Sequence, residues 1–114
     1  RQMPLLAGAV TATEIMRGIK LGLNIFKFFP AEAMGGVKTM QALADPFGDI
    51  RFIPTGGINA GNLSEYLRNP LIVAVGGSWM ARSSWIETGN WKQIEAETRY
   101  AISTISSLNV SLGG

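Results

Sequence analysis

The stretch Asn24-Ile25-Phe26-Lys27-Phe28-Phe29-Pro30-Ala31-Glu32 places a lysine at the centre of an aromatic and aliphatic run. The apolar run Ile25–Phe29 predicts a strand that is buried on both faces, and Pro30 ends it because proline cannot donate to a strand ladder. A charged amine without a partner is costly in such surroundings. Two interpretations of Lys27 stay open at this point. It is an amine held in an apolar slot, as a Schiff-base nucleophile requires, or a lysine whose stem is packed while its head reaches water.

Strand-like and helix-like segments alternate on both sides of this stretch. The predicted strands are Met3–Leu6, Ile25–Phe29, Arg51–Pro54 and Leu71–Val75. Apolar residues recur at helical spacing after each of them, within Ile15–Leu23, Val37–Leu43, Leu63–Leu67 and Ile94–Leu108. Four strand–helix units in a row favour an α/β fold with a parallel sheet and covering helices. The chain is either half of a (β/α)8 barrel or a small open doubly wound sheet, since a complete barrel takes at least about 200 residues.

Polar residues mark the beginnings of three of these helices. Thr11 with Glu14 forms a capping-box pattern, in which the hydroxyl and the carboxylate each accept a backbone hydrogen. Asn62 with Glu65 is a second candidate cap, and Asn90 a third. Between Met80 and Asn90 the sequence indicates irregular structure with at most a single turn.

Composition narrows the function classes. The chain has 114 residues, a net charge of +2, scattered basic residues, and neither cysteine nor histidine. It fits one domain over residues 1–114, and no apolar run is long enough for a membrane span. Scattered charge argues against nucleic-acid or anionic-membrane binding. The lack of cysteine excludes disulfides and thiolate metal sites and is compatible with a cytoplasmic enzyme.

Two successive loops after strands are rich in glycine, Thr55-Gly56-Gly57 and Gly76-Gly77-Ser78. Their backbone N–H groups, with the Ser78 hydroxyl, are expected to converge on a phosphate, as in barrels that bind it after the last two strands. Tight-turn geometry is the alternative for either loop alone. Lys27 lies at the same carboxyl edge of the sheet. A lysine nucleophile beside a phosphate cradle indicates a Schiff-base enzyme for a phosphorylated keto compound, with Phe26, Phe28 and Phe29 keeping water away. Ordinary core packing is the alternative role of these rings, and the two roles are compatible because alternate strand residues face opposite sides.

The motifs together resemble a known family. Phe26–Glu32, Gly35–Lys38, Pro54–Ile58 and Gly76–Trp79 closely resemble the C-terminal half of the 2-keto-3-deoxy-6-phosphogluconate (KDPG) and 4-hydroxy-2-oxoglutarate (KHG) aldolases. The match runs in order from about Pro4 to the final helix. The resemblance implies a class I aldolase, a lyase with a (β/α)8 barrel fold, that cleaves KDPG to pyruvate and glyceraldehyde 3-phosphate. It also implies a homotrimer without a metal.

The same resemblance implies roles for individual residues. Lys27 is the Schiff-base lysine, Phe29 lines the pocket beside it, and Thr55 lies where the family controls substrate stereochemistry. The residues implied to hold the substrate phosphate are Gly56, Gly57, Gly77 and Ser78.

The sequence departs from the family because the first half of the barrel has no counterpart here. In the family that half supplies the general-base glutamate, and neither Glu14 nor Glu32 stands at its position. We therefore expect a fragment, also suggested by Arg1 in place of an initiator methionine, with little or no activity alone. Three alternatives stay open: a non-catalytic phosphate-binding half-barrel that self-associates, a phosphogalactonate aldolase, and a phosphate-binding barrel without a Schiff base.

Overall fold

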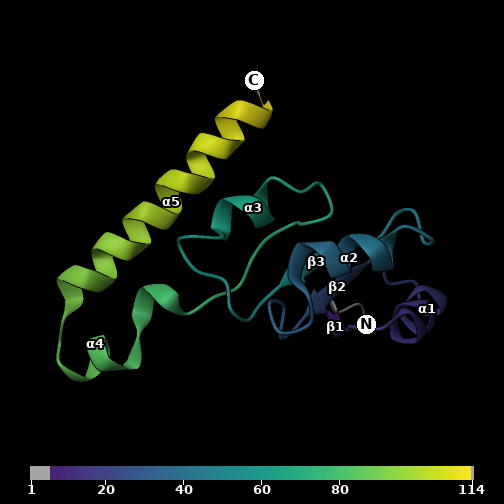
Figure 1. Cartoon of the computed structure of the whole chain (residues 1–114), viewed down its shortest axis with the longest axis horizontal. Coiled ribbons are helices and arrows are strands. Elements are labelled where there is room, and N and C mark those ends of the chain that lie inside the picture. Colours follow the sequence, from purple (N-terminus) through teal and green to yellow (C-terminus); the bar gives the residue numbers. More distant parts are fainter. Residues whose placement is uncertain (1–5, 114) are drawn as a thin grey trace, which may run out of the picture.

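A computed structural model of the chain describes residues 6–113, with side chains as far as Leu108. Strands and helices alternate up to α3 and are followed by helices only (Figure 1). The elements are β1 (Ala7–Gly8), α1 (Ala12–Lys20), β2 (Ile25–Phe28), α2 (Gly36–Ala44), β3 (Arg51–Pro54), α3 (Leu63–Leu67), η1 (Trp79–Ala81), α4 (Ser83–Glu87) and α5 (Trp91–Gly113). The predicted strand Met3–Leu6 lies outside the described residues except for Leu6, and the described strand begins one residue later.

The three strands form a parallel sheet in the order β1-β2-β3. Gly8 pairs with Lys27, and Lys27 pairs with Ile53, so the carboxyl ends of all three strands lie at one edge. Strand β3 has the predicted bounds, and β2 differs only in ending at Phe28. The parallel α/β arrangement inferred from four strand–helix units is therefore present over the first three.

One face of this sheet carries the core, and the other is open. Phe26, Phe28 and Phe52 are fully buried beneath the helices, and a β-carbon on Gly18 of α1 would lie 2.2 Å from the Phe26 ring. On the opposite face Lys27 is exposed, and Ile53 beside it is only half-buried. The prediction that this strand is buried on both faces is wrong, because helices cover only one side of the sheet.

The predicted fourth strand, Leu71–Val75, is not a continuous strand. Two isolated parallel bridges, Phe52 with Ile72 and Thr55 with Gly76, are all that joins this segment to β3. Val73 and Ala74 are exposed, so the segment has no second neighbour that would hold it extended. It nevertheless brings the Gly76-Gly77-Ser78 loop to the carboxyl edge of the sheet.

The predicted caps have different outcomes. Thr11 and Glu14 form the full capping box of α1, with the Glu14 amide donating to the Thr11 hydroxyl at 3.3 Å. Asn90 accepts a weak hydrogen bond of 3.4 Å from the Gln93 amide at the start of α5. Asn62 makes no capping bond for α3. Its side-chain nitrogen Nδ2 donates instead to the Gly57 carbonyl at 3.0 Å, so Asn62 ties the start of α3 to the glycine loop.

Helix α5 gives the molecule an extended shape. It packs against α3, α4 and η1 and runs away from the sheet (Figure 1). The radius of gyration is 15.8 Å, whereas a compact domain of this length would have about 13 Å. The chain is therefore more extended than a compact domain of its length.

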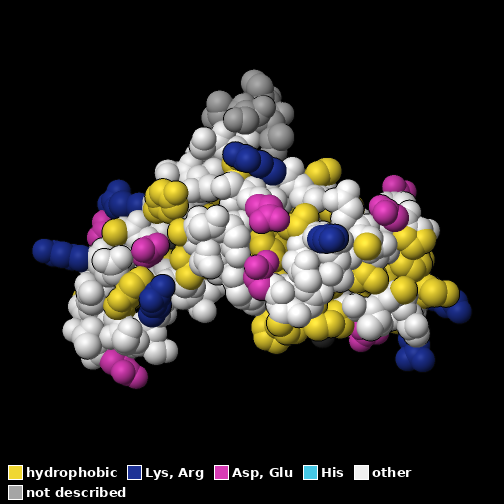
Figure 2. All heavy atoms as spheres, in the orientation of Figure 1, with side chains coloured by type: hydrophobic (Ala, Val, Ile, Leu, Met, Phe, Trp, Pro, Cys, Tyr) yellow, Lys and Arg dark blue, Asp and Glu magenta, His cyan; other side chains and the backbone are white. Residues whose placement is uncertain are grey.

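Charges are dispersed over the surface. Figure 2 shows Lys and Arg side chains scattered over the visible face among apolar and acidic ones, without a basic patch. Of the helices within the described residues, none is both long and apolar enough to cross a membrane.

Candidate active site

Four segments meet at the carboxyl edge of the sheet. The Ala9 amide donates to the Lys27 carbonyl at 3.0 Å, and the Thr55 amide donates to the Phe28 carbonyl at 2.9 Å. The Gly76 amide continues the series by donating to the Pro54 carbonyl at 2.9 Å. Backbone hydrogen bonds thus fix side by side the segments that follow β1, β2 and β3 and the Gly76–Ser78 loop.

Lys27 lines a cavity of about 270 Å³ at this edge, with Gly8, Ala9, Val10, Glu14 and Phe29. Its Nζ atom lies 5.8 Å from the centroid of the Phe29 ring, which is within the range of a cation–π contact. The expectation that Phe26 and Phe28 would also shield the amine is wrong. Successive side chains of a strand point to opposite faces, and these two lie in the core on the other side.

Glu14 in this cavity is a carboxylate whose proximity the sequence reasoning did not recognise. Its Oε1 atom accepts hydrogen bonds from the Val10 amide at 3.0 Å, the Thr11 amide at 3.1 Å and the Thr11 hydroxyl at 3.0 Å. The bond from Val10, and then that from the Thr11 hydroxyl, hold the pKa of Glu14 below its usual value. The capping box is the sequence signal for this proximity. It places Glu14 in the first turn of α1, and α1 begins shortly after β1 ends at the edge of the sheet where Lys27 lies.

The glycine loops line a second cavity, of about 310 Å³. Its lining residues are Phe29, Thr55, Gly56, Gly57, Ile58, Gly77 and Ser78. Among the described residues, the backbone N–H groups of three phosphate-site candidates, Gly57, Gly77 and Ser78, have no hydrogen-bond acceptor, whereas the parallel bridge between Thr55 and Gly76 engages the N–H of Gly56. Unpaired N–H donors that line one cavity form a ready site for an oxyanion.

Close packing explains why the first loop requires glycine. Gly56 and Gly57 have φ angles of 107° and 77°, which favour glycine. A β-carbon on Gly56 would lie 3.0 Å from Pro30 Cα, and one on Gly57 would lie 2.6 Å from Glu32 Cβ. The loop therefore rests directly on the turn that follows β2.

Phe29 is the wall that the two cavities share. It follows β2 directly, and its side chain is 57% exposed. The structure thus places Lys27 on one side of this ring and the other predicted site residues, Thr55 and the glycine-loop residues, on the other. One extended ligand lying across Phe29 would reach both cavities.

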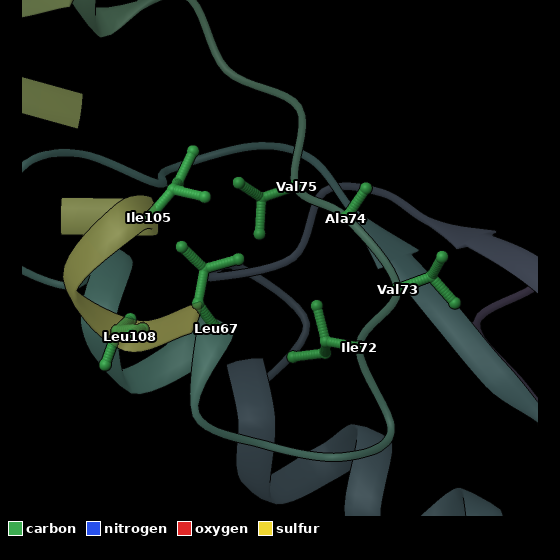
Figure 3. A pocket seen from close by; sticks show the side chains of 7 residues that line it. All are labelled: Leu67, Ile72, Val73, Ala74, Val75, Ile105 and Leu108. Carbon is green, nitrogen blue, oxygen red and sulfur yellow. The ribbon is translucent and has the colours of Figure 1, made fainter. Parts of the chain in front are cut away.

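A third cavity, of about 390 Å³, has a different character. It is lined by Leu67, Ile72, Val73, Ala74, Val75, Ile105 and Leu108. Figure 3 shows Leu67, Ile72 and Val75 pointing toward a common space, whereas Val73 points away from it. This cavity has only aliphatic side chains and carries no group for catalysis. The described residues also contain no cluster of three or more His, Cys, Asp or Glu side chains that would hold a metal ion.

Comparisons with known proteins show which family the chain is similar to. The chain is 49% identical over 100 residues to a 2-dehydro-3-deoxy-phosphogluconate aldolase of Dickeya dadantii, covering 88% of this chain and 47% of that protein. It is 45% identical over 100 residues to the KHG/KDPG aldolase of Escherichia coli K12, covering 88% of this chain and 47% of that protein. The chain thus spans about half the length of the curated relatives it matches.

A solved structure of the KDPG aldolase of Legionella pneumophila superposes with a TM-score of 0.78 and 39% identity. The superposition covers 91% of this chain and 49% of that one, which holds pyruvate as a covalent carbinolamine intermediate. The model of the KDPG and KHG aldolase family matches residues 1–97. This match covers most of the chain, and the chain therefore belongs to the KDPG and KHG aldolase family.

Proposed function

We propose that residues 1–114 correspond to the C-terminal half of a (β/α)8 barrel, as a single partial domain. The open face of the sheet supports this, because the inner face of a barrel strand is covered only when the ring of strands closes. The length relation supports it as well, since the matched relatives are about twice as long as the aligned part of this chain. A half-barrel also accounts for the exposure of Lys27, because the strands that would face it across the barrel would come from the other half.

The activity that we propose is class I aldol cleavage of KDPG. The Lys27 amine adds to the C2 carbonyl, and loss of water gives an iminium ion. A base takes the proton of the C4 hydroxyl, the C3–C4 bond breaks, and its electron pair moves to the iminium nitrogen. Glyceraldehyde 3-phosphate leaves. The remaining enamine is protonated at C3, and hydrolysis releases pyruvate and restores the amine.

The observation that carries this proposal is the pair of cavities joined at Phe29. Lys27 lines one of them, and the other is lined by Gly56 and by Gly57, Gly77 and Ser78, whose backbone N–H groups are unpaired among the described residues. An amine on one side of a shared wall and phosphate donors on the other suit a substrate with a keto group at one end and a phosphate at the other. Phe29 lies between the two cavities and Thr55 lines the glycine-loop cavity, and both are proposed to contact the middle of the substrate.

The base is the part that we assign to the absent half. Glu14 is the carboxylate of the Lys27 cavity, and its Oε1 already accepts three hydrogen bonds in the cap of α1. A carboxylate whose pKa is lowered by such bonds is a weak proton acceptor. We therefore expect the chain alone to cleave KDPG slowly or not at all, since general-base catalysis contributes about 10²–10⁴-fold.

Further features of the proposal follow the family. The ligand is a small phosphorylated 2-keto acid, with 4-hydroxy-2-oxoglutarate or the galactonate epimer as related substrates. The complete protein is expected to be a homotrimer of the cytoplasm that uses neither a metal nor a cofactor. Thr55, half-buried between β3 and the glycine loop, is the residue proposed to influence the choice among substrates.

A non-catalytic phosphate-binding half-barrel is the second candidate. The observation that favours it is the exposure of Lys27 on the open face of the sheet, because an exposed lysine is commonly only a solvated charge. In that case phosphate esters bind at the glycine loops, while Lys27 reacts no faster than other lysines of the chain.

Borohydride reduction in the presence of pyruvate distinguishes the two candidates. The aldolase proposal expects an irreversible mass increase corresponding to one reduced pyruvate per chain. It expects none in Lys27→Arg, which keeps the charge but not the nucleophile. Titration with glycerol 3-phosphate, an inert phosphate monoester, tests the cradle separately through the backbone amide NMR signals of Gly56, Gly57, Gly77 and Ser78. Absence of the adduct in a folded sample that binds the ester would favour the second candidate.

A further inference from the structure

A part-buried hydrogen bond ties the turn after β2 to the helix that follows the first glycine loop. The Tyr66 side chain on α3 is fully buried, and its hydroxyl donates to the Oε2 atom of Glu32. The two residues are 34 positions apart in the chain. Neither lines the Lys27 cavity or the glycine-loop cavity, so neither is placed to touch a substrate.

Glu32 is in close contact with the glycine loop through its backbone and its stem. The Ala31 amide donates to the Thr55 carbonyl at 2.8 Å, and the Glu32 amide donates to the Gly56 carbonyl at 3.1 Å. A β-carbon on Gly57 would lie 2.6 Å from Glu32 Cβ and 2.7 Å from its Cγ. The Glu32 stem therefore occupies the space beneath Gly57 that a side chain would otherwise fill.

The carboxylate of Glu32 is confined on its other side as well. A β-carbon on Gly36 would lie 2.9 Å from Glu32 Oε2 and 3.1 Å from the Tyr66 hydroxyl. Within residues 6–108, the ion pair that the structure contains joins Arg99 to Glu95, so no cation competes with Tyr66 for Glu32. A hydrogen bond to an ionised acceptor is shorter and about twice as strong as a neutral one, and this bond fixes the direction of the Glu32 side chain.

We propose that Glu32, held by Tyr66, is a positioning residue that sets the Gly56-Gly57 loop against the turn after the Lys27 strand. The pair thereby fixes the spacing between the phosphate donors and the amine on the other side of Phe29. The inference rests on the proposed phosphate site, and it adds residues that contribute to phosphate binding without contacting the phosphate.

Tyr66→Phe is the most selective test, because it removes one hydroxyl and keeps the buried ring. The backbone ¹⁵N order parameters of Gly56 and Gly57 are expected to fall, which reports loosening of the loop independently of any ligand. The dissociation constant for glycerol 3-phosphate is expected to rise on the order of tenfold, as for other supporting hydrogen-bond partners. Pyruvate trapping on Lys27 should keep its wild-type rate, since pyruvate has no phosphate.

Two further variants serve as controls. Tyr100→Phe makes the same chemical change on the exposed side of α5 and should alter none of the three measurements. Glu32→Gln retains the stem and an oxygen that accepts from Tyr66, so it should bind the ester better than Glu32→Ala does.

The measurements separate failure of this inference from failure of the proposed function. Wild-type chain that neither binds the ester nor traps pyruvate would overturn the proposed function. Unchanged order parameters and unchanged ester binding in Tyr66→Phe would overturn the positioning role alone. So would tighter ester binding by Glu32→Gln than by the wild type, because Glu32 would then act on phosphate only through charge repulsion.

Discussion

At the scale of single residues, the face of β2 on which a side chain lies decides what it does. Phe26 and Phe28 point into the core, while Lys27 between them points to the open face. Phe29, one residue beyond the strand, is free of this alternation and stands between the two cavities. Adjacent residues therefore serve the core and the candidate site, and no side chain serves both.

Gly57 offers a test of the loop packing with a matched control. Gly57→Ala places a β-carbon against Glu32 at a φ of 77°, whereas Gly48→Ala has a similar φ of 75° and no neighbour within 4 Å. Both carry a backbone cost of about 1–2 kcal/mol, and the contact with Glu32 adds about 1–3 kcal/mol for Gly57→Ala alone.

We expect Gly57→Ala to unfold at lower urea concentration than Gly48→Ala and to bind glycerol 3-phosphate on the order of tenfold more weakly, since the loop must shift. Gly48→Ala should bind as the wild type does. Equal ester binding by the two variants would contradict the packing described for this loop.

Tyr66 predicts a loss of stability at alkaline pH. Burial, followed by the hydrogen bond to Glu32 and the charges of Glu32 and Glu65, raises the pKa of Tyr66. The folded state therefore holds this proton more tightly than the unfolded state, whose pKa is about 10. The stabilisation is fully present below that value and is lost as the pH rises through the folded value.

Urea unfolding between pH about 8 and about 11 measures this effect, with a slope approaching 1.4 kcal/mol per pH unit above the unfolded pKa. Tyr66→Phe removes the titrating group, so its free energy of unfolding should fall less steeply over the same range. Parallel curves for the two proteins would contradict the raised pKa.

At the scale of elements, helix α1 depends on an ionised cap. The Glu14 carboxylate accepts hydrogen bonds from Val10 and Thr11, which lower its pKa. A lowered folded pKa stabilises the folded state above the unfolded value of about 4.3, and that stabilisation is lost as the pH falls through the folded value.

Glu14→Gln should therefore be less stable than the wild type at neutral pH, and the difference should close on acidification. Thermal unfolding of both proteins at neutral pH and at pH about 3, below the usual glutamate range, measures it. Glu87→Gln, at the exposed end of α4, is the matched control and should behave as the wild type at both pH values. A difference that persists at low pH would mean that Glu14 acts through packing.

The elements with local signals were predictable from the sequence, and those that depend on distant partners were not. The capping box at Thr11 predicted the start of α1, and the proline after β2 predicted the end of β2 to within one residue, because both act within a few residues. Burial of Phe29 and continuity of Leu71–Val75 depend on neighbouring segments, and the described residues cover neither fully, so pattern alone misjudged them. The Asn62 cap failed because its Oδ1 accepts from the Asn59 amide while its Nδ2 donates to the Gly57 carbonyl, two contacts that spacing does not reveal.

The residues of the candidate site also divide into those with a local sequence signal and those that depend on distant partners. Glycine pairs at successive strand ends placed Gly56, Gly57, Gly77 and Ser78 in one cavity, because parallel strands share a carboxyl edge. The contact between Tyr66 and Glu32 joins residues with no sequence signal between them. It appears only when the turn and α3 are packed together.

At the scale of the whole molecule, the uncovered sheet face should cause self-association. Val73 is 44% exposed beside β3, and the face of β2 and β3 that carries Lys27 is not covered by a helix. Uncovered strands and exposed apolar surface favour pairing with another chain. We expect the average mass in sedimentation velocity to rise with protein concentration.

A pair of substitutions locates the associating surface. Val73→Lys places a charge beside the open face and should weaken association several-fold, whereas Ile86→Lys on α4, a similarly exposed position, should not. A monomer at all concentrations would contradict the open face as an interaction surface.

The central claim, that Lys27 is the Schiff-base lysine, is tested most directly by locating the reduced pyruvate adduct. Lys20, Lys38 and Lys92 are exposed lysines of the same chain and serve as internal controls for non-specific reaction. After borohydride reduction, peptide mass mapping is predicted to find the pyruvate-derived mass on Lys27 and not on the other three. An adduct spread over all four lysines, or absent from Lys27 in folded protein, would contradict the account.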